Sequence, residues 1–387
     1  MSKEFDIALG SKIKVLRNSV GFTLEQAAER LGYKNYQVLL SIENGERTLK
    51  ASELSAISKL FHKDIGFFLS EQKAESEELL VRWRDCSNLK DRKEKETEFL
   101  AYCDSYYDLE TRLGLEYKHS LDQLNFSEAD LKNYDKIAQL AQDRANQWQL
   151  GSRPACALRK ILEEKNNVKV FFLELSGHGS AASAVGRFGA AILINRTDPQ
   201  GRRNYDLAHE VFHLITWDRF SGEEFSADGA KYKELETAAN AFASALLMPE
   251  ADVRREFGRK LKNEKISLVD LVGMSQEFEV SVDALLWRLV NLKILDRAPV
   301  AKLLSEDRQS IDAVKDFSNT CDCKETDLFL SEKYIYLAVK AFKEGLVSKS
   351  KLASYLKINI GDVEQVLSKY GYTLEDESNE ELAVTRR

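Results

Sequence analysis

The stretch from Asn204 to Ile215, Asn-Tyr-Asp-Leu-Ala-His-Glu-Val-Phe-His-Leu-Ile, decides how the rest of the chain is interpreted. Positions four apart share one face of an α-helix, so His209 and His213 project the same way. Two neutral imidazoles at this spacing can bind one zinc ion at about 2.0–2.1 Å. Glu210, beside the first imidazole, is placed to act as a general base. Two of the chain's five histidines fall at this spacing, which favours a metal site over a core helix with two buried histidines.

The next predicted helix offers a third ligand, as a catalytic zinc needs three protein ligands and one open position. Within Lys233-Glu-Leu-Glu-Thr-Ala-Ala-Asn-Ala-Phe-Ala-Ser-Ala-Leu-Leu-Met-Pro249, Glu236 is followed by small residues at Ala239 and Ala243. Small residues at this spacing let two helices approach closely, which favours Glu236 as the ligand. The carboxylates that compete with it are Glu223, Asp228 and Glu234.

Composition predicts several folded domains and no general affinity for polyanions. The chain has 387 residues, 43% of them hydrophobic and 31% charged, and a net charge of −7, so any contact with nucleic acid must come from a local patch. Its five cysteines form no disulfide framework, and we interpret the pair Cys321-Asp-Cys323 as incidental. The sequence contains no signal-peptide core and no run of about 20 apolar residues. We therefore expect a cytoplasmic protein without a membrane partner.

Four prolines and many helix-forming residues predict a mainly α protein with a small β-sheet, an α+β fold. The strand-like runs Val168–Leu173 and Ala190–Asn195 flank a stretch rich in Gly, Ser and Ala, which predicts a small hairpin or sheet. The expected divisions are an all-α domain over residues 8–70, a helical connector over 71–129, an α+β domain over 130–298 and a helical region over 299–387.

Two regions allow two interpretations each. Residues 71–129 are rich in charge, and we interpret them as a solvated connector helix. The alternative is a dimerising helix whose contact residues are Leu100, Cys103, Tyr107, Leu109 and Leu113. In the C-terminal region, Lys351–Leu367 predicts two amphipathic helices with a turn near Lys357–Gly361. We interpret them as a helical cap on the preceding domain, with a second helix-turn-helix as the alternative.

Residues 8–70 contain a run of short helices whose ends carry capping residues. Thr23 is placed to N-cap one helix, which Gly32 ends. The following helix runs from about Asn35 to Glu43 and stops at Asn44-Gly45. Small residues let the two helices cross closely, and apolar ones fill the space between them: Ala27, Ala28, Leu31, Leu39 and Ile42.

This packing leaves polar residues on the outer face of the later helix, where such domains read the major groove. Those residues are Asn35, Tyr36, Gln37 and Ser41. Gln37 or Asn35 could pair bidentately with adenine, and the residues placed to touch phosphates are Lys34, Arg47 and Lys50. Residues 1–70 carry ten Lys or Arg and eight Asp or Glu, a weak balance of +2. A protein-binding domain is therefore the alternative, and a homodimer would double the contacts to DNA.

The segment from Thr23 to Gly32, followed by Gln37-Val-Leu-Leu-Ser-Ile-Glu-Asn-Gly-Glu46, resembles the Xre/Cro-like helix-turn-helix repressors. The resemblance implies binding to an operator in double-stranded DNA. The chain departs from many members of that family at Leu24, where a phosphate-contacting Gln is common, and at Leu40, where a small polar residue is common.

The motif His-Glu-Val-Phe-His, followed by Glu-x-x-Ala-Asn-x-Phe-Ala and Leu-Leu-Met-Pro, resembles the ImmA/IrrE zinc metallopeptidases over about residues 130–295. Arg203, Tyr205-Asp-Leu-Ala208 and the later Glu279–Arg288 also fit. The resemblance implies a zincin-like metallopeptidase domain, with Glu210 as general base and a zinc ion held by His209, His213 and Glu236. Val211-Phe212 stand where Leu-Gly is usual, which makes the back of the site bulkier.

The leading hypothesis is a transcription regulator that binds DNA and hydrolyses a peptide bond in a repressor-type protein, itself or a partner, in a stress or mobile-element response. The alternative is a DNA-binding repressor or antitoxin whose peptidase-like domain is a non-catalytic sensor. We expect Ala190–Asn195 to present a strand edge to an extended substrate. We interpret His178 as a surface-loop histidine, with oxyanion stabilisation as the alternative.

Overall fold

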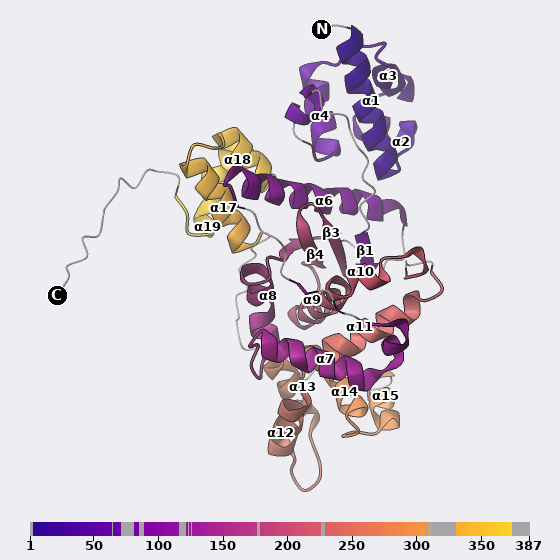
Figure 1. Ribbon diagram of the computed structural model, residues 1–387, viewed down its shortest axis with the longest axis vertical. Coiled ribbons are helices and arrows are strands. Elements are labelled where there is room, and N and C mark those ends of the chain that lie inside the picture. The colour runs from indigo at the N-terminus through magenta and orange to yellow at the C-terminus, as the bar shows by residue number, and fades with distance from the viewer. Residues whose placement is uncertain are drawn as a thin grey trace, which may run out of the picture. The chain divides into compact units, whose positions relative to one another are not determined.

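The structure is a computed structural model (Figure 1) that describes residues 3–63, 65–70, 81–84, 89–115, 121–122, 124, 126–175, 179–225, 229–305, 309, 311 and 330–373. It is mostly helical with one small sheet, which confirms the predicted α+β class. The strands are β1 (Val81–Arg84), β2 (Lys169–Leu173), β3 (Ala181–Gly186) and β4 (Gly189–Asn195). The α-helices are α1 (Lys3–Val20), α2 (Leu24–Arg30), α3 (Tyr36–Glu43), α4 (Ala51–Leu60), α5 (Ile65–Leu69), α6 (Leu89–Arg112), α7 (Tyr134–Gln147), α8 (Pro154–Glu164), α9 (Gln200–Ile215), α10 (Trp217–Phe220), α11 (Tyr232–Leu247), α12 (Glu250–Lys260), α13 (Leu268–Glu277), α14 (Val282–Asn291), α15 (Arg297–Ser305), α17 (Glu332–Lys343), α18 (Lys349–Leu356) and α19 (Val363–Lys369). Three short 3₁₀ helices are η1 (Glu128–Lys132), η2 (Glu223–Phe225) and η3 (Ile360–Asp362).

Helices α1 to α5 form a helical domain whose boundaries follow the predicted caps. The Thr23 hydroxyl accepts a hydrogen bond from the backbone N–H of Gln26 at 3.2 Å, so Thr23 N-caps α2. Asn35 caps α3 in the same way through the N–H of Gln37 at 2.9 Å. After α3 the chain turns at Gly45, whose φ of 69° suits glycine.

The core of this helical domain confirms the predicted packing. Ala27, Ala28, Leu39 and Ile42 are buried at the crossing of α2 and α3. An ion pair also lies inside the domain: Arg17 on α1 donates to both carboxylate oxygens of Glu43 on α3, at 2.6 and 3.0 Å. Both side chains are almost fully buried, so this pair joins the first and third helices through the core.

The sheet is mixed, with the strand order β1-β3-β4-β2. Strands β2 and β4 are parallel neighbours, and β3 is antiparallel to both β4 and β1. The two predicted runs are therefore not the two arms of a hairpin, because the small-residue stretch between them contains β3, which pairs with β4. The expectation that Ala190–Asn195 offers a free edge is wrong, since β4 has a partner on each side.

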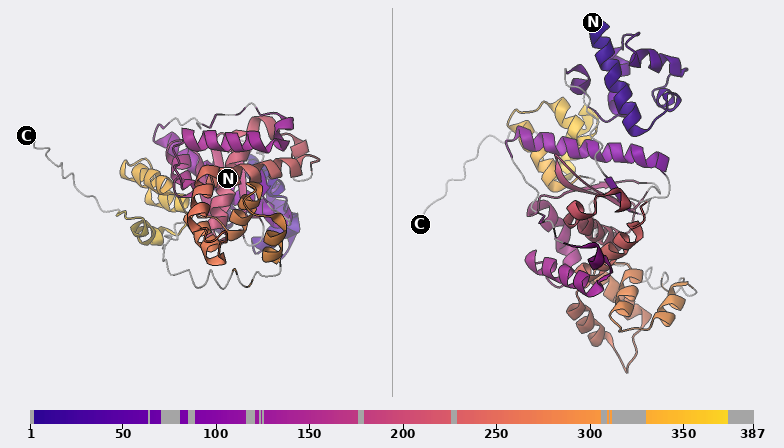
Figure 2. Two further views of the ribbon diagram at one scale, coloured as in Figure 1. Left: turned by 90° about the horizontal axis from the view of Figure 1, so that it is seen from below. Right: turned by 45° about the vertical axis from the view of Figure 1, so that its right-hand side comes forward.

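Helices pack on both faces of the sheet (Figure 1 and Figure 2). On one face, α9 packs against β3 and β4, and α11 packs against α9 and α7. On the other face, Phe99 and Tyr102 of α6 contact Phe171 of β2, with ring centroids 6.0 and 5.7 Å apart. Side chains alternate along β2, and Val170 and Phe172 belong to the core that contains α9.

The segment over residues 71–129 differs from the solvated connector that its charge predicts. Its first described part is strand β1, which is a member of the sheet. The following helix, α6, buries a full apolar stripe that includes Phe99, Tyr102, Cys103 and Leu109. The stripe was not evident from the sequence because many charged residues occupy the other faces of the same helix. Of the residues proposed for a dimer contact, Cys103 and Leu109 are thus used within the chain.

The C-terminal helices form a compact unit with the end of α6. Among the described residues, this second unit combines residues 104–115 with residues 330–373, whereas those within 3–103 and 121–311 form the first. The Tyr355 hydroxyl donates to the Asp108 carboxylate at 2.6 Å within the second unit. Helix α18 ends at Lys357 in a left-handed turn, which confirms the predicted turn there. In contrast, Val300 of α15 lies in the core of the first unit, so the expected 299–387 region is divided between the two. No helix in the described part of the chain has the length and apolar character needed to cross a bilayer.

Candidate metal centre and nucleic-acid interface

Helix α9 carries ionisable side chains into the core of the first unit. Every residue from Asp206 to Ile215 is buried, and His209 and Glu210 have no exposed surface. The first turn of α9 packs directly against the backbone at Val280. A side chain at Gly201 would not fit there, because a Cβ added at Gly201 would lie 2.6 Å from the Val280 carbonyl carbon. Polar groups buried in this way need compensating partners, and α11 and β1 supply those of His209 and Asp206.

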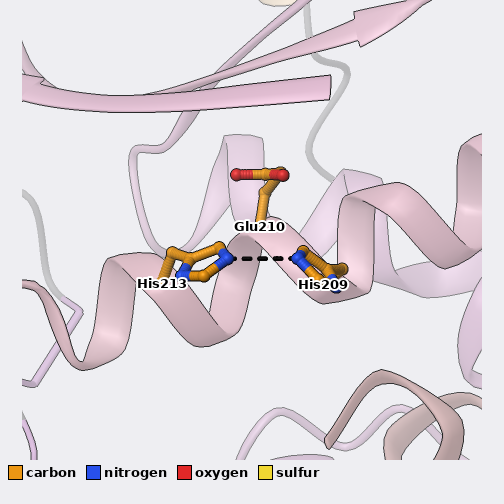
Figure 3. A group of neighbouring side chains, drawn as sticks. All are labelled: His209, Glu210 and His213. Carbon is orange, nitrogen blue, oxygen red and sulfur yellow. Dashed lines mark hydrogen bonds between the residues drawn. The ribbon is translucent and has the colours of Figure 1, made fainter. Parts of the chain in front are cut away.

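Two imidazoles and a carboxylate converge on one point. The Nε2 atoms of His209 and His213 are 3.1 Å apart, and Figure 3 shows both rings on the same side of α9. Glu236 of α11 brings Oε2 to 3.2 Å from His209 Nε2 and Oε1 to 3.1 Å from His213 Nε2. Ligands at about 2.0–2.1 Å from a tetrahedral zinc are separated by about 3.3 Å. The three side chains therefore fit the coordination of one such ion.

A second carboxylate, Glu210, stands apart from this triangle. Its ligand atoms lie within 4.8 Å of those of His209 and His213, but neither of its oxygens has a hydrogen-bond partner among the described residues. Burial raises the pKa of Glu210 to about 7. The centre thus contains one carboxylate that contacts both imidazoles and a second that lies close to them, so the two could serve as a metal ligand and a general base.

The ring of His209 is oriented from behind by Asn240 of α11. The His209 Nδ1 atom lies 3.0 Å from the Asn240 side-chain oxygen. Burial, and next the Arg84 guanidinium, lower the pKa of His209 to about 3. A neutral His209 that donates from Nδ1 presents the lone pair of Nε2 to the centre. A histidine in this state can bind a metal ion.

Arg84 and its partners are the residues that sequence reasoning missed. Arg84 of β1 donates to the side-chain oxygen of Asn240 at 3.1 Å and forms an ion pair with Asp206. Its neighbour on the same strand, Arg82, donates to the Phe225 carbonyl at 3.2 Å, and burial lowers the pKa of Arg82 to about 10. Asn240 lies within the quoted motif, whereas the only local sign of β1 is the alternation in Val-Arg-Trp-Arg.

Of the three carboxylates that compete with Glu236, the structure describes only the side chain of Glu234. Glu234 points away from the imidazoles, since its carboxylate pairs with Lys132 at 2.8 Å and is 40% exposed. Asp228, His178 and the Cys321-Asp-Cys323 pair lie outside the described residues, as does the side chain of Glu223.

The unusual Val211-Phe212 pair lies in the core behind the site. Both residues are fully buried, and the Phe212 ring contacts those of Phe126 and Phe242, with centroids 6.0 and 5.5 Å apart. The larger side chain of Phe212 is therefore accommodated by packing against other aromatic rings.

The surface around α3 contains the residues predicted to contact DNA. The exposed ones are Lys34, Asn35, Tyr36, Gln37 and Lys50, and the half-buried ones are Ser41 and Arg47. Three of them make internal contacts, since the Gln37 side-chain oxygen accepts from the Asn35 amide at 3.3 Å. The Asn35 oxygen caps α3, so its acceptor is already used. Arg47 donates to Glu53 at 2.8 Å, so a phosphate contact from Arg47 would compete with that ion pair.

Comparison with known families finds a match for each of the two domains. A family model described as "Helix-turn-helix" matches residues 13–68, and a peptidase-family model described as "IrrE N-terminal-like domain" matches residues 163–290. The chain therefore joins a helix-turn-helix domain, of the type found in DNA-binding regulators, to a peptidase-like domain of the IrrE type, as the two resemblances implied. No curated protein matches the chain.

Proposed function

We propose that the chain is a transcription regulator that binds operator DNA and uses zinc to hydrolyse a peptide bond in a repressor-type protein, itself or a partner. The observation that carries this proposal is the triangle of His209, His213 and Glu236, whose sides measure 3.1 to 3.2 Å. The two histidines are buried and the Glu236 side chain is 18% exposed, and all three lie in a domain that matches a peptidase family. Three such ligands leave a fourth position open for water or substrate.

The side chains of the centre have two roles in the proposed reaction, namely binding zinc and transferring a proton. His209, His213 and Glu236 would hold the zinc ion, which when bound supplies a Lewis acid for the peptide carbonyl and lowers the pKa of a bound water. The Glu210 carboxylate takes the proton of the attacking water and delivers it to the leaving amine nitrogen. Glu210 suits this task because neither of its oxygens makes a close hydrogen bond among the described residues, and only the nearby Ser183 side chain of β3 interacts with it as a donor.

The free edge of β1 is the site where we propose that an extended substrate segment docks. Among the described residues, β1 pairs only with β3, so its outer edge has no strand partner. The Tyr232 hydroxyl, one helical turn before Glu236, donates to the Trp83 carbonyl at 3.4 Å. This contact places the β1 edge beside the helix that carries the third ligand. Strand addition there would bring a peptide bond next to the zinc site.

The helix-turn-helix domain would locate this activity on DNA. We propose that Tyr36, Gln37 and Ser41 of α3 face the major groove, with Asn35 at its N-cap, and that Lys34, Arg47 and Lys50 contact phosphates. The small local charge balance makes a homodimer on a two-fold operator the arrangement that fits best.

Hydrolysis by the full-length protein tests the proposal. Zinc-loaded wild type is incubated alone and with a peptide library of mixed sequence, and products are identified by mass spectrometry. Glu210→Gln, which keeps the shape of the side chain, should retain zinc and lower the cleavage rate by about 10²- to 10⁴-fold. Cleavage that is equal in wild type and Glu210→Gln would contradict the proposed mechanism. Zinc binding without cleavage in either assay would instead support a non-catalytic sensor.

A further inference from the structure

A network of four side chains joins strand β1 to the back of the metal centre. Arg84 forms an ion pair with Asp206 of α9 through one guanidinium nitrogen, and its other terminal nitrogen donates to the Asn240 side-chain oxygen at 3.1 Å. The same Asn240 oxygen lies 3.0 Å from His209 Nδ1. One guanidinium thus connects the sheet with both helices that supply the ligands.

The chemistry of arginine fixes the direction of every hydrogen bond in this chain. A guanidinium can only donate, so the Asn240 atom that faces Arg84 must be its oxygen. An amide oxygen can only accept, so His209 Nδ1 must carry its proton, and Nε2 is left with the lone pair. Without Arg84, the Asn240 amide could rotate by 180° and offer its NH₂ group to Nδ1. His209 would then carry its proton on Nε2, where zinc has to bind.

We infer that Arg84 is a positioning residue for zinc binding, because through Asn240 it fixes the tautomer and orientation of His209. The inference rests on the proposed zinc centre. Outer partners of this kind affect metal affinity by about 10- to 100-fold.

Burial and packing make the network rigid. His209 is fully buried, the Asp206 side chain is 1% exposed and that of Arg84 is 17% exposed. Tyr205 contacts two members of this network. Its hydroxyl donates to the Asn240 backbone carbonyl at 2.8 Å, and its ring lies 5.4 Å from the Arg84 guanidinium. Because water has little access, a lost hydrogen bond in this network is not easily replaced.

Arg84 comes from a part of the chain between the two domains. Arg84 lies outside both matched segments, 13–68 and 163–290, and belongs to the stretch that follows the helix-turn-helix domain. The metal centre is therefore completed by a strand from the region between the two domains, which pairs with β3 through Arg84 opposite Ala181.

Zinc affinity of full-length variants, measured by competition with a chromophoric chelator, tests the inference. Arg84→Met should weaken zinc binding by about 10- to 100-fold. The key comparison is in the Asn240→Asp background, because a carboxylate accepts from Nδ1 whichever way it is turned. There, adding Arg84→Met should cost much less affinity. Arg84→Lys, which keeps a donor-only group, should retain part of the affinity when Asn240 is intact.

Arg82→Met is the matched control. Arg82 lies two residues earlier on the same strand and is half-buried, but it donates to the Phe225 carbonyl and not to Asn240. Its charge also acts on Glu236 and Glu210, so its removal takes away a cation that repels zinc. Its loss should not weaken zinc binding. Long-range ¹⁵N–¹H spectra of zinc-free protein with labelled histidine should show the His209 proton on Nδ1 in wild type and in Asn240→Asp.

The outcomes separate this inference from the proposed function. If wild type binds no zinc, the proposed function fails and the inference fails with it. If wild type and Arg84→Met bind zinc equally well, only the inference is overturned. Equal losses from Arg84→Met in the wild-type and Asn240→Asp backgrounds would also overturn it, because Arg84 would then act only as a structural brace.

Discussion

Glu236 on α11 lies 3.2 Å from His209 on α9, measured from carboxylate Oε2 to imidazole Nε2. Its other oxygen lies 3.1 Å from His213. The contact depends on the close packing of the two helices, which buried Ala239 and Ala243 of α11 permit. The helix pairing that builds the core thus also assembles the ligand set.

The Glu236 contact predicts the result of a matched pair of substitutions. Glu236→Gln should abolish tight zinc binding, because a neutral amide replaces the one charged ligand. Glu234→Gln, two residues earlier on the same helix, should leave zinc content unchanged, because Glu234 pairs with Lys132 near the surface. Elemental analysis of both proteins after dialysis measures the difference. Loss of zinc from Glu234→Gln with retention in Glu236→Gln would reverse the assignment.

Breaking the buried ion pair of Arg17 and Glu43 should strongly lower the free energy of unfolding of the helix-turn-helix domain. Glu43→Gln leaves the Arg17 charge buried without its partner, so we expect local stability to fall by about 3–5 kcal/mol. Hydrogen exchange of α1 to α3 amides in the full chain measures this change. As a control, Glu250→Gln breaks the exposed pair with Arg254 and should change the stability of α12 by less than about 1 kcal/mol. A similarly small effect for Glu43→Gln would contradict the expectation.

DNA contacts from α3 should differ in kind between Gln37 and Lys34. On an operator selected from random DNA, Gln37→Ala should cost about 1–3 kcal/mol and relax the preference for one base. Lys34→Ala should weaken binding to all sequences alike and reduce the slope of log K against log salt by about one. Fluorescence anisotropy over a series of salt concentrations distinguishes them. Lys160→Ala, on α8 outside this domain, serves as the control and should leave binding unchanged. Unchanged binding in both Gln37→Ala and Lys34→Ala would refute the predicted interface.

The environment of Cys156 predicts the pH dependence of its alkylation. Cys156 is exposed, but partial desolvation, and next the Glu279 carboxylate that accepts from the thiol at 2.9 Å, raise the pKa of Cys156 to about 11. Because a raised pKa depletes the reactive thiolate at neutral pH, alkylation by iodoacetamide should be slow at pH 8 and accelerate up to about pH 11. Glu279→Gln should lower this pKa and speed the reaction at pH 8. Peptide mass spectrometry follows the site, and an unchanged rate in Glu279→Gln would argue against the contact.

Features set by local spacing were predictable from the sequence. The shared face of His209 and His213 follows from the helical period alone, and the cap at Thr23 follows from a residue within the same turn. Glu236 was identifiable because Ala239 and Ala243 indicated a close helix crossing, although it depends on contacts between two helices.

Features set by long-range pairing were not predictable. Arg84 belongs to a four-residue strand in a charge-rich segment, and it reaches the site only because β1 pairs with β3, about a hundred residues later. Similarly, the apolar runs of β2 and β4 indicated strands but not their parallel order, since periodicity says nothing about which strands become neighbours. The part of the metal centre hidden from the sequence was therefore the support behind His209.

The most direct test of the central claim is the zinc content of purified wild type, Glu210→Gln and His213→Ala, measured by elemental analysis after dialysis. We predict about one zinc ion per chain in wild type and in Glu210→Gln, and none in His213→Ala, since three ligands hold a catalytic zinc and the base does not. Wild type that retains no zinc even after zinc is supplied would contradict the account. Loss of zinc from Glu210→Gln would show that Glu210 is a ligand and not the base.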